Sequence, residues 1–232
     1  MRIDILTLFP EMFGSFLGTS IPKRAAEKGL VEYRLTNFRD FATDAHQSVD
    51  DKPFGGGPGM VMMCQTVYDA VEAVEQQDPR PATRILLTPQ GQRFDQRMAE
   101  DFAARDRLLL IAGRYEGFDE RISEGLKPTE VSIGDYVLSG GELAAMCVID
   151  AVVRLLPGAL GAEDGAADET FADGLIEHPQ YTRPRDFRGM QVPDILLSGN
   201  HAAIAKWRLE QRKIRTRARR PDLWSAYEAK EK

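Results

Sequence analysis

Three short, glycine-bearing segments have the composition of a binding site, because each directly follows a run of apolar residues. They are residues 88–91, 113–117 and 132–142. If the apolar runs are neighbouring strands of an open α/β sheet, the three segments lie beyond the carboxyl ends of those strands, where such sheets bind ligands. Glycines let the backbone approach a ligand closely. The apolar side chains suited to a flat ring are Tyr115, Ile133, Tyr136 and Leu138. We therefore predict one small-molecule pocket; the simpler alternative is three unrelated tight turns.

The spacing of the glycines excludes the common nucleotide-binding motifs. Residues 55–59 contain four glycines, but the Lys-Ser/Thr pair of a phosphate-binding P-loop does not follow them. Residues 134–141 do not form the G-x-G-x-x-G pattern of dinucleotide-binding folds. The third segment carries Asp135 and Glu142 where a phosphate site would need a cation. The pocket is therefore predicted to hold a ligand other than a phosphate group.

A fourth loop, residues 46–60, is long and rich in glycine and proline, and loops of this kind are often functional. His46, Asp50 and Asp51 have the donor atoms for a metal ion, but we favour an ordinary polar loop and expect no metal site. Two cysteines and three histidines in the whole chain also leave little for a structural zinc site.

The charge of the chain is distributed unevenly. The net charge of the 232 residues is −6, yet residues 206–220 hold eight basic side chains and one acidic side chain. This segment therefore carries +7 and the rest of the chain −13. A basic segment on an acidic protein predicts a localised contact with an anionic partner such as a nucleic acid.

Strand-like and helix-like segments alternate before residue 160. The predicted strands are residues 2–9, 31–36, 84–88, 108–112 and 130–133, and the predicted helices are residues 21–28, 67–75, 94–104 and 142–156. This alternation predicts a mostly parallel sheet with helices on both faces. The last helix places Glu142, Asp150 and Arg154 on one stripe, and without further information an Asp150–Arg154 surface ion pair is the expectation.

Beyond residue 160 the pattern changes. Residues 161–175 are acidic and glycine-bearing and are predicted to be a flexible linker between a domain at 1–160 and a helical domain at 176–232. A helix at residues 200–219 ends before Pro221. Its predicted packing stripe, which leaves a broad cationic face, is Ile204, Trp207, Ile214 and Ala218, with Gln211 in the gap.

The composition also indicates where the protein resides. The most apolar long run, residues 143–160, is interrupted by Asp150 and Arg154, so a membrane span is not expected. The first nine residues resemble a strand more than a signal peptide. Cys64 and Cys147 lie far apart and form no C-x-x-C pattern, which is typical of a protein in the reducing cytoplasm.

Five strings in one order carry a family resemblance. They are VDDKPFGGGPGM, GRYEGFDER, SIGDYVLSGGEL, YTRP and LLSGNH. Together they resemble the bacterial tRNA (guanine-N1)-methyltransferases of the SPOUT class, over residues 1 to about 223. The resemblance implies an α/β fold: a parallel-sheet trefoil-knot domain followed by a small all-helical C-terminal domain. It also implies a cytoplasmic homodimer with active sites shared between subunits. The implied reaction is methylation, by S-adenosylmethionine, of N1 of the tRNA guanosine at position 37, just 3′ of the anticodon.

The resemblance carries site residues onto this sequence. The implied cofactor-binding residues are Pro89, Gly113, Tyr115, Glu116, Ile133, Gly134, Asp135, Tyr136, Val137, Leu138, Gly140 and Gly141. The expected RNA-binding residues are Asp50, Arg212, Lys213, Arg215, Arg217, Arg219 and Arg220, all but the first from the basic segment. The sequence gives no argument for or against a role of Mg²⁺.

The chemistry assigns roles to the expected catalytic residues. Guanine N1 carries a proton at neutral pH, so its methylation needs a base near N1 and a hydrogen-bond donor near O6. Arg154 matches the family's arginine and supplies the donor. The family's linker pattern E-D-S-F becomes Asp168-Glu169-Thr170-Phe171 here, so Glu169 takes the base position and Asp168 is the alternative. Ala144 also replaces the usual proline.

Two other functions are compatible with the same residues. One is a knotted methyltransferase that acts on a different RNA. The other is an RNA-binding module that has lost catalysis, which the intact run 133–141 argues against. Titration with the cofactor distinguishes the second of these from an enzyme.

Overall fold

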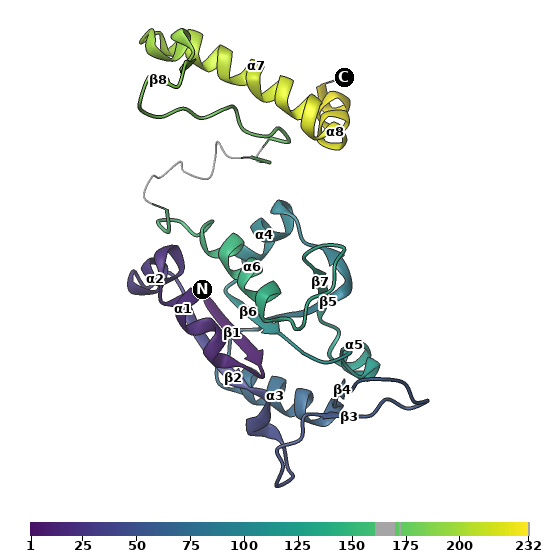
Figure 1. Ribbon diagram of the computed structural model, residues 1–232. Helices are drawn as coiled ribbons and strands as arrows, with labels where there is room; N and C mark the ends of the chain where they lie inside the picture. Colours follow the sequence, from purple (N-terminus) through teal and green to yellow (C-terminus); the bar gives the residue numbers. More distant parts are fainter. Residues whose placement is uncertain (161–169, 172, 232) are drawn as a thin grey trace. The chain divides into compact units, whose positions relative to one another are not determined.

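The computed structural model describes residues 1–160, 170–171 and 173–231. The chain divides into two compact units, Met1–Glu163 (unit 1) and Asp164–Lys232 (unit 2). Both are drawn in Figure 1, and each is described by itself.

Unit 1 is built on a five-stranded sheet in the order β2-β1-β6-β5-β7, and every neighbouring pair of strands is parallel. The strands are β1 (Arg2–Thr7), β2 (Glu32–Asn37), β5 (Thr83–Arg93), β6 (Arg107–Ile111) and β7 (Thr129–Ser132). The five predicted strands and the parallel sheet are thus confirmed. Central strands such as β1 and β6 are buried throughout, as expected for a parallel sheet covered on both faces.

Helices cover both faces of this sheet, as predicted (Figure 1). The helices of unit 1 are α1 (Gly14–Leu17), α2 (Ser20–Glu27), α3 (Cys64–Gln76), α4 (Gln96–Ala103), α5 (Glu120–Leu126) and α6 (Glu142–Val153), with 3₁₀ turns η1 (Pro10–Phe13) and η2 (Phe38–Phe41). Side chains alternate along β1: Ile3 and Ile5 join the core cluster that contains α6, and Leu6 joins the cluster that contains α3. This period of two is what places one apolar core on each face.

Strand β5 differs from the prediction at its carboxyl end. It continues to Arg93, and both Leu87 and Gln92 pair with Val131 of β7. The four residues between them make an excursion that returns to the same strand. At Gly91 an added Cβ atom would overlap the backbone of Glu130 and Val131, so the returning chain lies directly against β7. A knotted path through this region remains a prediction.

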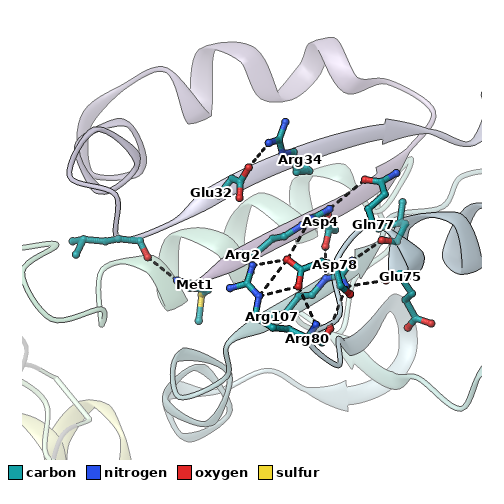
Figure 2. A network of polar contacts seen from close by, with 12 residues as sticks. Met1, Arg2, Asp4, Glu32, Arg34, Glu75, Gln77, Asp78, Arg80 and Arg107 are labelled. Carbon is teal, nitrogen blue, oxygen red and sulfur yellow. Dashed lines mark hydrogen bonds and ion pairs between the residues drawn. The ribbon is translucent and has the colours of Figure 1, made fainter.

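A buried ionic network lies at the opposite, amino end of the sheet (Figure 2). The Asp4 carboxylate, 1% exposed, accepts hydrogen bonds from Arg2 (2.7 and 2.8 Å) and from Nε of Arg107 (2.8 Å). Arg107 also donates to the carbonyl groups of Val74 (2.6 Å) and Asp78 (2.7 Å), at and just beyond the end of α3. The network therefore satisfies the last carbonyls of α3 and holds that helix on the sheet.

Unit 2 is mainly helical. It contains a short hairpin, β8 (Asp186–Phe187) and β9 (Met190–Gln191), then the 3₁₀ turn η3 (Asp194–Leu197), α7 (His201–Arg219) and α8 (Pro221–Glu231). The hairpin adds strand residues to a unit expected to be all helical. Pro221 ends α7 as predicted and also begins α8, because the first turn of a helix tolerates proline.

The predicted packing stripe of α7 is wrong in its second half. Ile214 is 51% exposed and Ala218 is exposed, whereas Thr216 is completely buried. The hydroxyl of Thr216 accepts a hydrogen bond from the backbone N–H of Ile176 at 3.0 Å. Arg212, one turn earlier, pairs with Asp173 at 2.5 Å. The segment 173–176 thus sets which face of α7 is covered, and this face contains Arg212 and Thr216.

Among the described helices, none combines the length and apolar character needed to cross a membrane. Both cysteines are free thiols: Cys64 is half-buried and Cys147 is exposed.

Candidate active site

The three predicted loops meet in one cavity of about 230 Å³ at the carboxyl ends of β5, β6 and β7. This volume is a little below the roughly 300–1,000 Å³ of typical small-molecule sites. Of the expected cofactor residues, those that line the cavity are Pro89, Gly113, Tyr115, Glu116, Ile133, Gly134, Tyr136, Val137, Leu138, Gly140 and Gly141. Asp135 is exposed and lies outside this lining. The structure therefore brings eleven of the twelve residues together.

Backbone contacts join the second and third loops directly. The N–H of Gly141 donates to the carbonyl of Gly113 at 2.8 Å. Arg114 and Gly140 form an isolated antiparallel bridge. Two stretches of chain that leave different strands thus form one continuous wall of the cavity.

Two of the glycines are explained by packing within the wall. At Gly140 an added Cβ atom would overlap Nε of Arg114 and lie 2.5 Å from Oε2 of Glu142. At Gly141 it would lie 2.9 Å from the Cα atom of Ala112. We expected these glycines to admit a ligand to the backbone, but in the structure the space beside them is filled by the protein itself.

The charge of the lining is mostly negative. Three carboxylates line the cavity, those of Glu116, Glu120 and Glu130, together with one guanidinium, that of Arg114. Arg114 is already paired, because its Nε lies 2.9 Å from Oε2 of the buried Glu142. Such a lining favours a ligand that carries positive charge and disfavours a phosphate. The apolar side chains Leu86, Leu87, Val131, Ile133 and Leu138 complete the wall.

The fourth predicted loop is attached to the cavity, a link that the sequence did not indicate. Its ends pair as the short strands β3 (Asp50–Asp51) and β4 (Val61–Met62). The N–H of Glu116 donates to the carbonyl of Met60 at 3.0 Å, and the N–H of Met62 donates to the carbonyl of Gly117 at 2.9 Å. The base of this loop is therefore fixed to the second loop of the pocket.

Tyr115 connects the same two loops through its side chain. Its backbone φ of +63° is left-handed, which is an outlier for a bulky residue and typical of functional sites. Partial burial, and then the nearby Asp50 carboxylate, raise the pKa of the Tyr115 hydroxyl above its ordinary value. The expected RNA contact Asp50 thus lies beside a residue of the cavity wall.

Arg154 lies at the end of α6 remote from the cavity. It is the half-buried C-cap residue of that helix, whereas Gly141 and Ala144 at the other end line the cavity. The predicted common stripe of Glu142, Asp150 and Arg154 is wrong, because Glu142 is 1% exposed and faces Arg114 while Asp150 is exposed. The eight residues from Glu142 to Asp150 correspond to about 800° of helical rotation, which is about 80° beyond two full turns and points to a different face.

The expected base lies outside the described residues. This holds for both Glu169 and its alternative Asp168. Thr170 and Phe171, which follow them, are described, and the ring of Phe171 lies 5.8 Å from the guanidinium carbon of Arg220.

The eight basic residues of the segment 206–220 fall into two groups. Four are exposed: Lys206, Arg208, Arg217 and Arg219. The others are half-buried: Arg212 pairs with Asp173, Lys213 lies over the Tyr227 ring at 5.7 Å, Nε of Arg215 is buried, and Arg220 pairs with Asp222. The cationic face is therefore narrower than the count of bases suggests.

Comparison with known proteins identifies the family. Residues 1–226 match the family described as "tRNA (Guanine-1)-methyltransferase TrmD". The chain is 58% identical over 227 residues to the tRNA (guanine-N(1)-)-methyltransferase of Geobacillus kaustophilus, covering 98% of this chain and 93% of the relative. It is 56% identical over 231 residues to the protein of the same name from Anoxybacillus flavithermus, covering 100% and 94%. A third such relative, from Dehalococcoides mccartyi, is 56% identical over 223 residues, covering 96% and 90%.

Proposed function

This chain belongs to the tRNA (guanine-1)-methyltransferase family, and we propose from that premise that its cavity binds S-adenosylmethionine. It is a tRNA (guanine-N1)-methyltransferase, because the family match covers residues 1–226 and the relatives cover nearly the whole chain. We further propose that the target is the guanosine at position 37, just 3′ of the anticodon, and that the enzyme acts in the cytoplasm.

The composition of the cavity wall is the observation that supports binding of S-adenosylmethionine. S-adenosylmethionine, when bound, supplies a methyl group on a positively charged sulfur. The apolar side chains Ile133 and Leu138 suit its flat purine ring, and Glu116, Glu120 and Glu130 suit its two positive charges. The wall thus fits a cationic nucleoside better than a nucleotide, in agreement with the absence of any phosphate-binding motif in the sequence.

The chain's own residues would have two tasks at the guanine. A carboxylate, Glu169 or Asp168, removes the N1 proton, and general-base help of this kind is typically worth about 10²–10⁴-fold in rate. Arg154 donates hydrogen bonds to O6, where negative charge develops as the proton leaves. Both roles rest on the family resemblance and on the chemistry of guanine.

The position of Arg154 supports a shared active site. The rise of α6 separates Ala144 in the cavity wall from Arg154 by about 15 Å, at roughly 1.5 Å per residue. An arginine side chain is too short to cover that distance and reach its own cavity. We therefore propose a homodimer in which Arg154 of one chain serves the cavity of the other.

An exposed apolar stripe on α6 supports the same arrangement. Leu143 is 49% exposed, and Cys147, one turn later, is also exposed. Val148 and Val152, elsewhere around the same helix, are buried in the core. Val148 and Val152 thus belong to the core, and Leu143 remains available to a partner. A stripe repeated on a second copy forms a self-complementary contact across a two-fold axis.

Unit 2 is the part that we propose binds tRNA. The exposed residues Arg217 and Arg219 present positive charge that suits the backbone phosphates of the anticodon loop. Turning a stacked purine out of the loop costs a few kcal/mol, roughly, and phosphate contacts offset that cost. We propose residues 161–175 as the linker between this RNA-binding domain and the methyltransferase domain.

Methyl transfer to a tRNA transcript tests the function. Purified protein, S-adenosylmethionine and a transcript with guanosine at position 37 should give a methylated base that stops reverse transcription there, because N1-methylation blocks Watson–Crick pairing. A transcript with adenosine at position 37 is the matched control and should give no stop. Methylation at another position would overturn the proposed target, and cofactor binding without transfer to any tRNA would favour the RNA-binding module.

A further inference from the structure

Behind the cavity wall lies a buried carboxylate that no assigned role uses. Glu142 is the first residue of α6, is 1% exposed, and does not line the cavity. A carboxylate buried this completely is costly unless its environment compensates the charge. Its partners therefore indicate what the carboxylate does.

Each oxygen of Glu142 contacts a different element. Oε1 accepts a hydrogen bond from the hydroxyl of Thr7, the last residue of β1, at 3.0 Å. Oε2 lies 2.9 Å from Nε of Arg114, in the loop after β6, in a charge–charge contact whose angles fall short of a directed hydrogen bond. The carboxylate also sits in the first turn of α6, where the helix dipole favours negative charge.

Arg114 also contacts the third loop and Phe9, the residue just before η1. Its guanidinium lies over the ring of Phe9 at 4.6 Å, and its Nη1 donates to the carbonyl of Ser139 at 3.4 Å. Arg114 lines the cavity and is the one cation among the lining residues. Removal of Glu142 would leave this cation without its carboxylate and would free it to enter the cavity.

We propose that Glu142 and Arg114 are positioning residues for the cofactor. Their ion pair, supported by Thr7, sets the spacing between the loop after β6 and the loop before α6, and it keeps the guanidinium away from a cationic ligand. Gly140 is glycine because the pair occupies the space that its Cβ atom would fill. This inference rests on the proposed binding of S-adenosylmethionine in the cavity.

The test compares two buried carboxylates of unit 1, Glu142 of α6 and Asp4 of β1. Glu142→Gln keeps the size of the side chain and removes its charge, and Asp4→Asn makes the same change in the network at the amino end (Figure 2). Isothermal calorimetry with S-adenosylmethionine gives the dissociation constant, circular dichroism gives the melting temperature, and steady-state kinetics with tRNA separate kcat from the KM for the cofactor.

We expect Glu142→Gln to raise the dissociation constant and the KM at least about tenfold, as the loss of one charge-assisted contact does. At saturating cofactor its kcat should stay within about twofold of the parent, since Glu142 touches no reacting atom. Asp4→Asn should lower the melting temperature without changing the dissociation constant. Arg114→Lys, which keeps the charge but loses the forked donors, should give an intermediate dissociation constant.

Three results would overturn the proposal. The first is a dissociation constant for Glu142→Gln within twofold of the parent. The second is an equal shift in Asp4→Asn, which would mean that loss of stability alone explains the change. The third applies if Glu142→Gln does not fold. Thr7→Val then replaces it, because this change removes only the supporting hydroxyl, and an unchanged dissociation constant in Thr7→Val would overturn the proposal. A parent protein that binds no S-adenosylmethionine would instead overturn the proposed function.

Discussion

The separation between the cavity and Arg154 makes a prediction about subunits. Ala144 lines the cavity and Arg154 caps the other end of the same helix, about 15 Å away along its axis. Suppose that each site combines the cavity of one chain with Arg154 of the other chain. A blocked cavity and a missing Arg154 on the same chain then damage two different sites of the dimer. Two single variants isolate these features: Ile133→Trp, which fills the cavity, and Arg154→Ala.

Counting intact sites gives the expected activities. A heterodimer of Ile133→Trp with Arg154→Ala has one normal cavity, and that cavity receives Arg154 from the Ile133→Trp chain. It should therefore show about half the activity of the parent dimer, although each homodimer is inactive. The matched control places both substitutions on one chain and pairs it with a parent chain. Here the normal cavity faces the altered Arg154, so this heterodimer should be inactive.

The assay requires heterodimers of known composition. Co-expression of the two chains with different affinity tags, followed by two purification steps, provides them without subunit exchange. Methyl transfer to tRNA at saturating cofactor is then compared per dimer. Sites built within one chain give the opposite pattern, with an inactive first heterodimer and a half-active control, and that pattern would refute the argument from the length of α6.

Three further predictions concern the RNA-binding face, the base and the core. The double variant Arg217→Ala/Arg219→Ala should weaken tRNA binding about tenfold, as measured by fluorescence anisotropy. It should also reduce the slope of log K against log salt by about 1.4, because each lost contact with a phosphate of the single-stranded loop reduces that slope by about 0.7. The control removes the same charge from two exposed arginines of unit 1, Arg24 and Arg97. Glu169→Gln should lower kcat by about 10²-fold or more with little change in cofactor affinity; a mild effect there and a severe one in Asp168→Asn would reassign the base. Asp4→Asn should cost about 3–5 kcal/mol of unfolding free energy in urea titrations, because it breaks a buried ionic pair; a loss below about 1 kcal/mol would contradict the assigned role of this network.

The sheet was predictable from the sequence because its signals are local. Apolar runs of strand length alternate with helix-length segments, and each glycine-bearing loop follows its strand directly. The parallel order then requires the three loops to meet at one edge of the sheet. The observed strands differ from the predicted ones mainly at their ends. Strand β5, for example, continues to Arg93 because the chain returns to pair with Val131.

Contacts between distant segments were not predictable in the same way. The Arg114–Glu142 pair joins two loops that leave different strands, and no periodic pattern indicates it. The same holds for α7, whose buried face is selected by the segment 173–176 and not by its own apolar residues. Helical spacing shows which residues share a face, but the neighbouring chain decides which face is covered.

In the proposed mechanism, helix α6 serves both requirements of the reaction, binding of the methyl donor and binding of the guanine. Its first residues close the cavity and carry the buried Glu142, and its C-cap residue at the other end is Arg154. A straight helix keeps these ends apart, so a guanine held near Arg154 cannot also lie near the cavity of the same chain. If Arg154 binds the guanine as proposed, bringing the methyl donor and the guanine together requires a second copy of the helix that runs past the first in the opposite direction. The exposed stripe of Leu143 and Cys147 is the surface on which such a pair would pack. On this argument a monomer could bind the cofactor but could not methylate tRNA.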